Sequence, residues 1–473
     1  MRRKLLWMSV AAVLTIAIAV GCGGGGGSTS TQMARVNLSL SDPPTCAGPS
    51  GAFGHVYVTI KDVKIHTSAS ANENDGGWVD LTPDLSKAPQ QVDLLGIANN
   101  NCFLAMLGSQ TALQPGTYQQ IRVYLADDAA AGTITGNKCN GAANCVVLAA
   151  DNSVHALDLS SESRTGIKIP SGQLAGGKFV IAAGETKDLN IDFDACASIV
   201  SQTGGRFRLK PVLHAGEVKL TSSSVSGKLV DQTTNAPIVG GKAIVALESR
   251  DASGVNRVVM QVTPDASGNF VLCPVPTGTY DVVAVAVSGS GVAYAATVAT
   301  GVQPGNALGN IPMVAQTGTS TAPASITGQV TTTKGTATVA DVTLATLQSI
   351  TVGGTTVNIV VPLAQQSSAT ATVPTTTDAS CPANTACASY TLSVPAMQPN
   401  VGTFAAAGTT YTQATTTPVA YSVNARAFVQ GSGATPDCSP SEVTVATLAG
   451  GGALTVTPGA SSAASTGTFT GCQ

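Results

Sequence analysis

The side chains that could carry out chemistry are few and widely spaced in this chain of 473 residues. The four histidines are His55, His66, His155 and His214, and no two stand at the spacing of a metal site. There is no Gly-x-Ser-x-Gly nucleophile elbow, no phosphate-binding loop and no dinucleotide-binding fingerprint. Because no acid, base and nucleophile can be assembled from the sequence, we predict neither an enzyme nor a cofactor.

Three carboxylates are the best candidates for binding an ion. Asp188, Asp192 and Asp194 alternate with apolar residues and therefore fall on one face of a predicted strand. Their oxygens could hold a hard cation. The alternative is a solvated face, or one that pairs with Arg122 or Lys210 across the sheet. Since a calcium site usually gathers six or more oxygens from a loop, we favour the alternative and predict no metal.

Cysteines are the other reactive residues, and their number indicates export. Apart from Cys22, the chain has ten, and an even number favours disulfides outside the cytosol. Proximity in the sequence predicts the pairs Cys139–Cys145 and Cys381–Cys387. Cys438 could then pair with Cys472, and Cys46 with Cys102. Cys196 and Cys273 lie in different predicted regions and stay unassigned. No Cys-x-x-Cys or Cys/His spacing indicates zinc.

The elements that must hold these residues are predicted to be strands. Apolar residues alternate with polar ones at 36–40, 56–65, 121–125 and 189–193, which is typical of half-buried strands. The phase shifts by one residue near Lys61 and Asp62, which predicts a β-bulge. The fold class that follows is all-β, with tandem antiparallel β-sandwich domains on a flexible Gly-rich tether.

Composition divides the body of the chain into three regions. The first region, 34–220, holds most of the charges and Trp78, the second spans 223–315, and the third, 322–473, has six charged side chains. Thr/Ser-rich junctions at 221–224 and 316–321 separate them, and we expect the first two regions to fold alone.

The N-terminus reads as an export signal and a membrane anchor. Arg2, Arg3 and Lys4 precede an apolar stretch at 5–20, too short for a membrane span, so residues 1–21 are predicted to be a signal peptide. The residues before Cys22, AVG, resemble the bacterial lipobox, in which the cysteine is lipidated after cleavage; the alternative is an ordinary signal with a chance cysteine. Residues 22–33 then form the lipidated end and the tether.

The lipobox resemblance implies a membrane partner. A lipid on Cys22 would anchor the protein to the cell envelope, and Gly23 after it is similar to the pattern sorted to the outer membrane. Cleavage leaves 20 basic against 26 acidic side chains. A mildly acidic chain without basic blocks excludes nucleic acid as a partner.

The first region resembles a domain-of-unknown-function family of bacterial lipoproteins. The motifs that carry the resemblance are SDPP at 41–44, VYVTI at 56–60, WVDL at 78–81, DLL at 93–95, PGTY at 115–118, DFD at 192–194 and LKP at 209–211. Because the family has no assigned activity, the resemblance implies architecture and location but no chemistry.

The second region resembles the carboxypeptidase-regulatory-like or starch-binding-like β-sandwich, a transthyretin-type fold. Its matching motifs are VSGKLV at 225–230, APIVG at 236–240, DASGNF at 265–270 and PTGTYDV at 276–282. Some relatives cross-link a lysine to an asparagine with help from a glutamate. Residues 272–275 offer no carboxylate for that role, so we expect no such bond.

Three functions are compatible with these observations. We favour a non-catalytic envelope lipoprotein that binds or scaffolds a polysaccharide or a surface protein outside the cell. A purely structural stalk is the second, and an enzyme with an unrecognised site is the third. Exposed aromatic residues would favour sugar binding over a stalk, and Trp78 is equally compatible with a core position.

Overall fold

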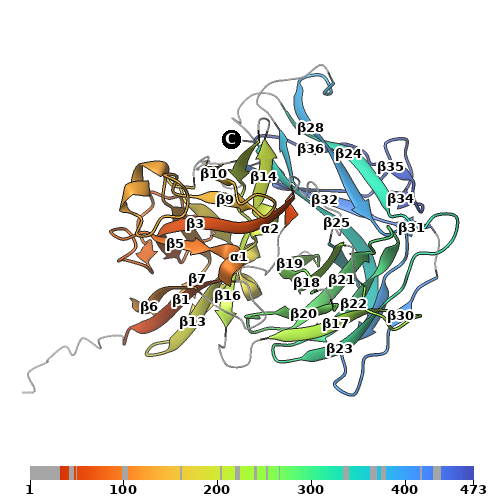
Figure 1. Cartoon of the computed structure of the whole chain (residues 1–473), viewed down its shortest axis with the longest axis horizontal. Coiled ribbons are helices and arrows are strands. Elements are labelled where there is room, and N and C mark those ends of the chain that lie inside the picture. The colour runs from red at the N-terminus through yellow and green to blue at the C-terminus, as the bar shows by residue number, and fades with distance from the viewer. Residues whose placement is uncertain are drawn as a thin grey trace, which may run out of the picture.

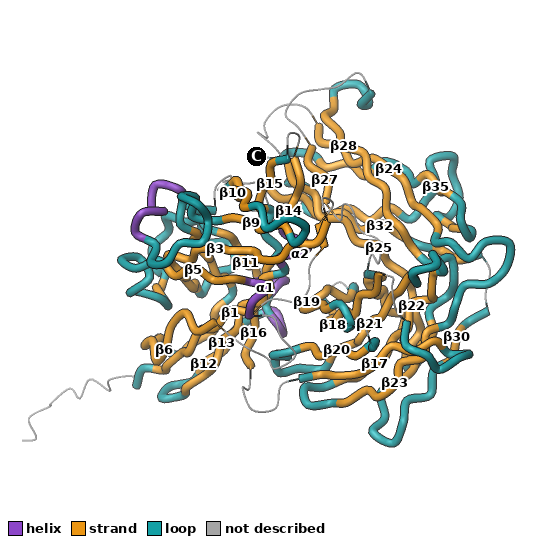
Figure 2. Tube along the Cα trace, in the orientation of Figure 1, coloured by secondary structure: helices purple, strands orange, loops and turns teal. Residues whose placement is uncertain are grey.

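The computed structural model describes most of the chain and confirms an all-β fold. It describes residues 32–41, 47–48, 51–97, 105–159, 162–202, 205–218, 224–238, 242–251, 254–265, 267–333, 340–362, 370–373, 380–415, 418–429 and 438–472. Figure 2 shows that helices are short in this part of the chain. None of them is long and apolar enough to cross a membrane. Cys22, Cys46 and Cys102 lie outside the described residues.

The first region is a sandwich of two mixed sheets, on the left of Figure 1. One sheet has the order β16-β13-β1-β6, and the other has β11-β8-β3-β9-β10-β15-β14 with β2, β4 and β5 also on β3, while β12 pairs with β7. The elements are β1 (Ala34–Ser41), β2 (Ala47–Gly48), β3 (Gly51–His66), β4 (Val79–Asp80), β5 (Gln90–Asp93), α1 (Leu94–Ile97), β6 (Ala105–Leu113), β7 (Gly116–Tyr118), β8 (Gln120–Leu125), η1 (Asp128–Thr133), β9 (Cys145–Leu148), β10 (Val154–Asp158), β11 (Ile167–Pro170), η2 (Ser171–Gln173), η3 (Ala175–Gly177), β12 (Phe179–Ile181), β13 (Thr186–Phe193), α2 (Ala195–Ser198), β14 (Ile199–Gln202), β15 (Arg206–Leu209) and β16 (Leu213–Val218).

Alternation of apolar residues explains how these two sheets pack. Leu38 and Leu40 of β1 meet Val56 and Val58 of β3 in one core whose buried residues all belong to the first region. The bulge is confirmed, because the register between β3 and β8 shifts between Ile60 and Asp62. Most pairings in the molecule are antiparallel, but β1 and β13 run parallel. That parallel pair brings the two ends of the first region together in one sheet.

The second region begins as another sandwich. Its strands are β17 (Val225–Asp231), β18 (Lys242–Arg250), β19 (Asn256–Val262), β20 (Asn269–Leu272), β21 (Tyr280–Val287), β22 (Ala293–Val302) and β23 (Ala307–Met313). The sheet β20-β17-β23 covers one face of the sheet β19-β18-β21-β22. The third region adds β29 and β30 to the second of these sheets, so this sheet crosses the junction at 316–321.

The third region packs two further sheets against the second. Its strands are β24 (Ala324–Thr333), β25 (Ala340–Val352), β26 (Thr355–Val361), β27 (Thr370–Val373), β28 (Thr385–Val394), β29 (Asn400–Thr403), β30 (Thr412–Gln413), β31 (Val419–Ala420), β32 (Ser422–Val429), β33 (Glu442–Val445), β34 (Thr455–Val456), β35 (Ser461–Ala463) and β36 (Gly467–Phe469). The main sheets are β28-β24-β35, with β36 also on β24, and β26-β25-β32-β33, with β27 also on β25. In Figure 1 these strands lie beside β21 and β22 on the right.

Strand β21 is buried on both of its faces. Val282 and Ala284 lie in the core of the second region, whereas Val283 and Val285 lie in the core that the third region builds. The segment between the two regions is also held in place by hydrogen bonds. The side-chain amide N–H of Gln316 donates to Ala322 O, and the side-chain carbonyl of Gln316 accepts from the backbone N–H of Ala396. The second and third regions therefore share a sheet and a core.

Candidate functional site

Two of the three candidate carboxylates, Asp188 and Asp192, lie on β13 and face polar side chains on β1, and Asp194 directly follows the strand. Asn37 donates to Asp188 at 2.8 Å, and Ser41 donates to Asp192 at 2.8 Å. The face is buried rather than solvated, since Asp192 and Asp194 are each 5% exposed. The amide of Gln261 on β19 donates to Asp194 at 2.7 Å, so this face meets the second region. The expectation of a solvated face is therefore wrong for Asp192 and Asp194, whereas Asp188 is only half-buried.

Burial changes the charge of Asp192. It raises the pKa of this carboxyl to about 8, with a smaller contribution from the nearby charge of Asp194, although the hydrogen bond from Ser41 opposes the shift. Its Oδ2 atom is buried without a hydrogen-bond partner. A carboxyl that holds its proton at neutral pH is a poor ligand for a hard cation. Among the described residues, no group of three or more His, Cys, Asp or Glu side chains could hold a metal ion.

Of the two partners considered for these carboxylates, Lys210 donates to Val342 O at 3.4 Å, and Arg122 serves a different part of the fold. Its guanidinium donates to Thr165 O and Ala71 O, and lies 3.8 Å from Glu73. It also sits 5.5 Å from the ring centre of Trp78. The backbone around Ala71 thus covers the outer face of β8, which is why this strand is buried on both faces.

Trp78 is half-buried and contributes to the same packing. Its indole N–H donates to Asn72 O at 2.8 Å, and its ring lies 5.0 Å from the ring of His66. Because the ring is held between a cation, an imidazole and a backbone carbonyl, this tryptophan stabilises a turn. The sequence offered a core position as the alternative to an exposed binding residue, and the structure places Trp78 between the two, half-buried at a turn.

The histidines are dispersed, and two of them have reactive neighbours. His155 Nε2 lies 2.8 Å from Ser153 Oγ in the β9–β10 turn, a contact that the sequence analysis missed. A serine nucleophile needs a base that is itself oriented by a third group. No hydrogen bond orients the other ring nitrogen of His155 among the described residues, and Asp151 accepts from Ser153 instead.

The second pair lies on the outer face of β3. His55 contacts Asp93 at 2.6 Å, and the imidazole stacks on the ring of Tyr57 with centres 5.5 Å apart and planes 19° apart. His55 is exposed and Tyr57 is half-buried. Burial, and to a lesser extent Asp93, raises the pKa of the Tyr57 hydroxyl, which therefore stays protonated. The arrangement offers a flat aromatic pair beside a carboxylate.

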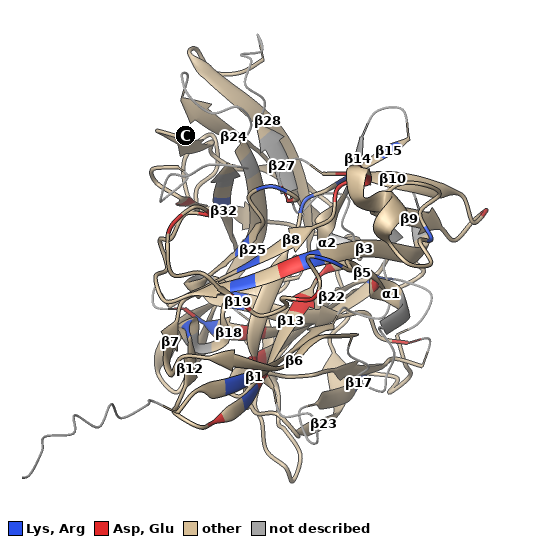
Figure 3. Ribbon diagram, turned by 90° about the vertical axis from the view of Figure 1, so that its left-hand side faces the viewer, with Lys and Arg blue, Asp and Glu red and all other residues tan. Residues whose placement is uncertain are grey.

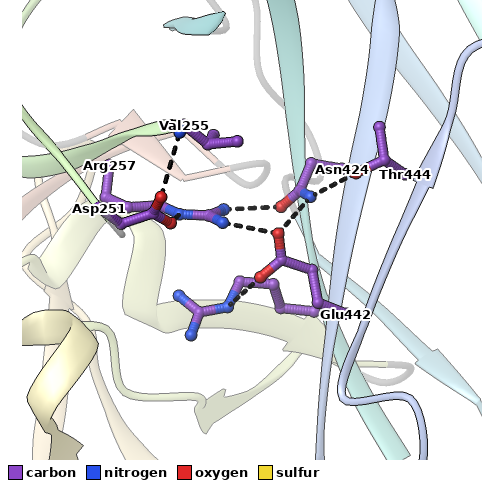
Figure 4. A network of polar contacts seen from close by, with 7 residues as sticks. Asp251, Val255, Arg257, Asn424, Glu442 and Thr444 are labelled. Atoms are coloured by element: carbon purple, nitrogen blue, oxygen red, sulfur yellow. Dashed lines mark hydrogen bonds and ion pairs between the residues drawn. The ribbon is translucent and has the colours of Figure 1, made fainter. Parts of the chain in front are cut away.

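The largest polar network in view joins the second and third regions (Figure 4). Arg257 on β19 donates to Asp251 at 2.8 Å, to Asn424 on β32 at 2.8 Å and to Glu442 on β33 at 2.6 Å. Asn424 in turn donates to Glu442 at 2.7 Å and to Thr444 at 2.9 Å. No spacing in the sequence could have indicated this network, because Arg257 and Glu442 stand 185 positions apart.

The junction network also perturbs its neighbours. Arg426 contacts the same glutamate at 3.5 Å, and burial together with the adjacent Arg257 lowers its pKa. Burial, then the charge of Arg426, lowers the pKa of His214 on β16 to about 4, so this histidine is neutral. The two arginines of the network are paired with Asp251 and Glu442, so their charges neutralise one another. These contacts hold β19 against β32 and β33.

Among the described side chains, seven cysteines are disulfide-bonded. The bonds Cys139–Cys145, Cys381–Cys387 and Cys438–Cys472 are present and join cysteines that the sequence analysis paired. Cys273 is also disulfide-bonded, to a cysteine whose side chain is not among those described. The proposed Cys46–Cys102 bond lies outside the described residues.

Residues 33–211 match the family described as a domain of unknown function, DUF4382. The match covers most of the first region and confirms the predicted resemblance to a domain-of-unknown-function family, whereas the lipoprotein part of that prediction stays a prediction. The resemblance of the second region to a carboxypeptidase-regulatory-like sandwich stays a prediction. Among curated proteins, no sequence matches this chain.

Several solved structures of other proteins are distantly similar to this chain. The shaft pilin SpaA from Lactobacillus rhamnosus GG is 12% identical, with 60% of this chain and 99% of that chain covered and a TM-score of 0.17. A streptococcal ancillary pilin is 10% identical over 61% and 64%, with a TM-score of 0.17. A putative adhesin from Bacteroides ovatus is 12% identical over 44% and 79%, with a TM-score of 0.15. Similarity this low carries no information about what this chain does.

Proposed function

We propose that this chain is a non-catalytic scaffold of the bacterial cell envelope, anchored to the outer membrane through a lipid on Cys22. The main observation in support of the proposal is that the side chains that could react or bind a ligand instead hold the fold together. Asp192, Arg257 and Trp78 are each engaged in packing or in hydrogen bonds that hold strands together. Groups that are engaged in this way are not available to bind or transform a substrate.

A scaffold also needs a body that keeps its shape. The shared sheet of β22 and β29 and the Arg257 network both support a rigid connection between the second and third regions. Strands β24 and β28 of the third region contain no Lys, Arg, Asp or Glu, as their tan colour in Figure 3 shows. A stalk or a platform for another envelope component would use such a surface.

Lipid attachment is tested by metabolic labelling with palmitate. The wild-type protein should incorporate label and fractionate with outer membranes, whereas Cys22→Ser should do neither, because only a thiol accepts the diacylglyceryl group. The double variant Cys381→Ser/Cys387→Ser removes two other cysteines and should keep the label. An unlabelled wild-type protein would refute the anchor.

Polysaccharide binding is a second candidate, favoured by the aromatic pair on β3. Sugar rings stack on flat aromatic faces, and their hydroxyls donate to carboxylates such as Asp93. In a glycan-array experiment Tyr57→Ala should abolish binding, while Trp78→Phe, which keeps a ring at the half-buried turn, should retain it. Absence of glycan binding by the wild-type protein would refute polysaccharide binding and leave the scaffold as the one proposed function.

A further inference from the structure

The large apolar side chains that are exposed in the described part of the chain all lie in the first region or directly before it. Three large ones are exposed among the described residues: Met33 at 38%, Val180 at 45% and Met106 at 46%. The described parts of the second and third regions expose none. Isolated exposed apolar residues are common on protein surfaces, so their position matters more than their number.

Two of the three lie at the end of the sandwich where the described chain begins. Met33 directly precedes β1, whose Ala34 pairs with Leu113 at the end of β6. Val180 lies in β12, which pairs with β7, the strand that starts soon after Leu113. The turn that follows β12 returns to the same place, since the N–H of Arg35 donates to Glu185 O at 2.8 Å. In Figure 2, β12 and β6 accordingly lie together at the lower left.

This end also carries positive charge. Arg35 and Lys178 are exposed, and neither forms an ion pair with a carboxylate among the described residues. The nearby carboxylate of Glu185 accepts from the backbone of Ala182 and contacts Lys187 at 3.6 Å. Apolar side chains flanked by unpaired cations are the combination that binds the interface of an anionic membrane.

We propose that this tether end, formed by Met33, Arg35, Lys178 and Val180, rests on the anionic lipid surface that holds the anchor. The proposal depends on lipidation of Cys22, as proposed above. Nine residues, 23–31, separate that cysteine from the described body, so the chain between them has ten steps. They reach at most about 35 Å when extended, and a Gly-rich chain of this length averages about 17 Å end to end. The bilayer is therefore the surface that the tether end meets most often.

Methionine oxidation tests the orientation with an internal control. Met33 and Met106 are both exposed, but Met106 pairs with Ser39, well along β1 from the tether end. The full lipoprotein is reconstituted into vesicles of phosphatidylethanolamine and phosphatidylglycerol, or of phosphatidylcholine alone, and treated with hydrogen peroxide. The oxidation rate of Met33 relative to Met106 should fall about threefold or more on the anionic vesicles.

Charge reversal provides the matched variants. Arg35→Glu/Lys178→Glu should restore the Met33 rate on anionic vesicles, whereas Arg250→Glu/Lys242→Glu, which reverses two exposed cations of the second region, should not. An equal Met33 to Met106 ratio on both kinds of vesicle, in protein that floats with them, would overturn the orientation while leaving the anchor intact. Protein that does not float overturns the anchor and this orientation with it.

Discussion

Removal of the third region should unfold the second. A chain that stops at Thr321 loses β29, the Arg257 network and the strands that cover the outer face of β21 and β22. Four valines of that face, Val283, Val285, Val287 and Val298, are each at most 5% exposed in the full chain. The structure thus gives a physical reason to expect the opposite of independent folding for 223–315.

The magnitude follows from the area that becomes exposed. Burial of a valine side chain stabilises a protein by roughly 1.5–3 kcal/mol, so four of them are worth about 6–12 kcal/mol as an upper bound. A whole domain is stable by about 5–15 kcal/mol. Exposure of this one face is therefore sufficient to unfold a region of this size.

Calorimetry of the two chains is the decisive measurement. The truncated chain should keep the transition of the first region, whose core is its own, and lose the transition of the second. The triple variant Val283→Thr/Val285→Thr/Val287→Thr sharpens the test, because it should destabilise the full chain, in which these side chains are buried, and leave the transition of the first region unchanged. A truncated wild-type chain that retains both transitions at unchanged temperatures would refute the shared core.

Three further predictions concern the buried polar groups and the disulfides. The raised pKa of Asp192 means that folding favours the neutral carboxyl. Its contribution to the free energy of unfolding therefore declines by about 1.4 kcal/mol per pH unit as the pH rises from the unfolded-state pKa of 3.8 to about 8. In urea titrations Asp192→Asn should gain stability relative to the wild type across that window, and equal pH slopes would contradict the burial argument. Arg257→Met should cost about 1.5–3 kcal/mol because Asp251 and Glu442 each lose a charged donor. The double variant with Glu442→Gln should recover part of this cost, whereas additive losses would show that the two side chains do not interact. By loop closure, loss of Cys438–Cys472, which spans 34 positions, should cost about 4 kcal/mol, against about 2 kcal/mol for Cys139–Cys145, which spans 6; equal losses would refute that ranking.

Local patterns in the sequence were sufficient to predict the strands. Alternation at Val36, Leu38 and Leu40 specifies which face of β1 is buried, and the phase shift in β3 specifies a bulge, because both depend only on adjacent residues. The nearest-neighbour disulfides are predictable for the same reason. Alternation does not reveal what covers the polar face, and so the environment of Asp192 was mispredicted.

Contacts between distant segments were beyond the reach of these patterns. The burial of β21 between two cores is indicated by its own sequence, since YDVVAVAV at 280–287 is apolar on both faces, as in strands buried on both sides. The pattern does not say which segment supplies the second cover. The Arg257 network had no signal, because each of its polar residues reads as an ordinary surface residue in its own strand.

The position of flexibility along the chain distinguishes a scaffold from a string of independent binding modules. Modules that search for ligands are usually joined by linkers in which few contacts cross. Here the segment at 316–321 is bonded on both sides, since the carbonyl of Thr321 accepts from Ala293 and Gln316 contacts both Ala322 and Ala396. Limited proteolysis of the full chain should therefore spare this segment, and an early cut there would show that the regions move independently. With the second and third regions held as one unit by these bonds, they act as one rigid part of a scaffold rather than as two modules that search independently.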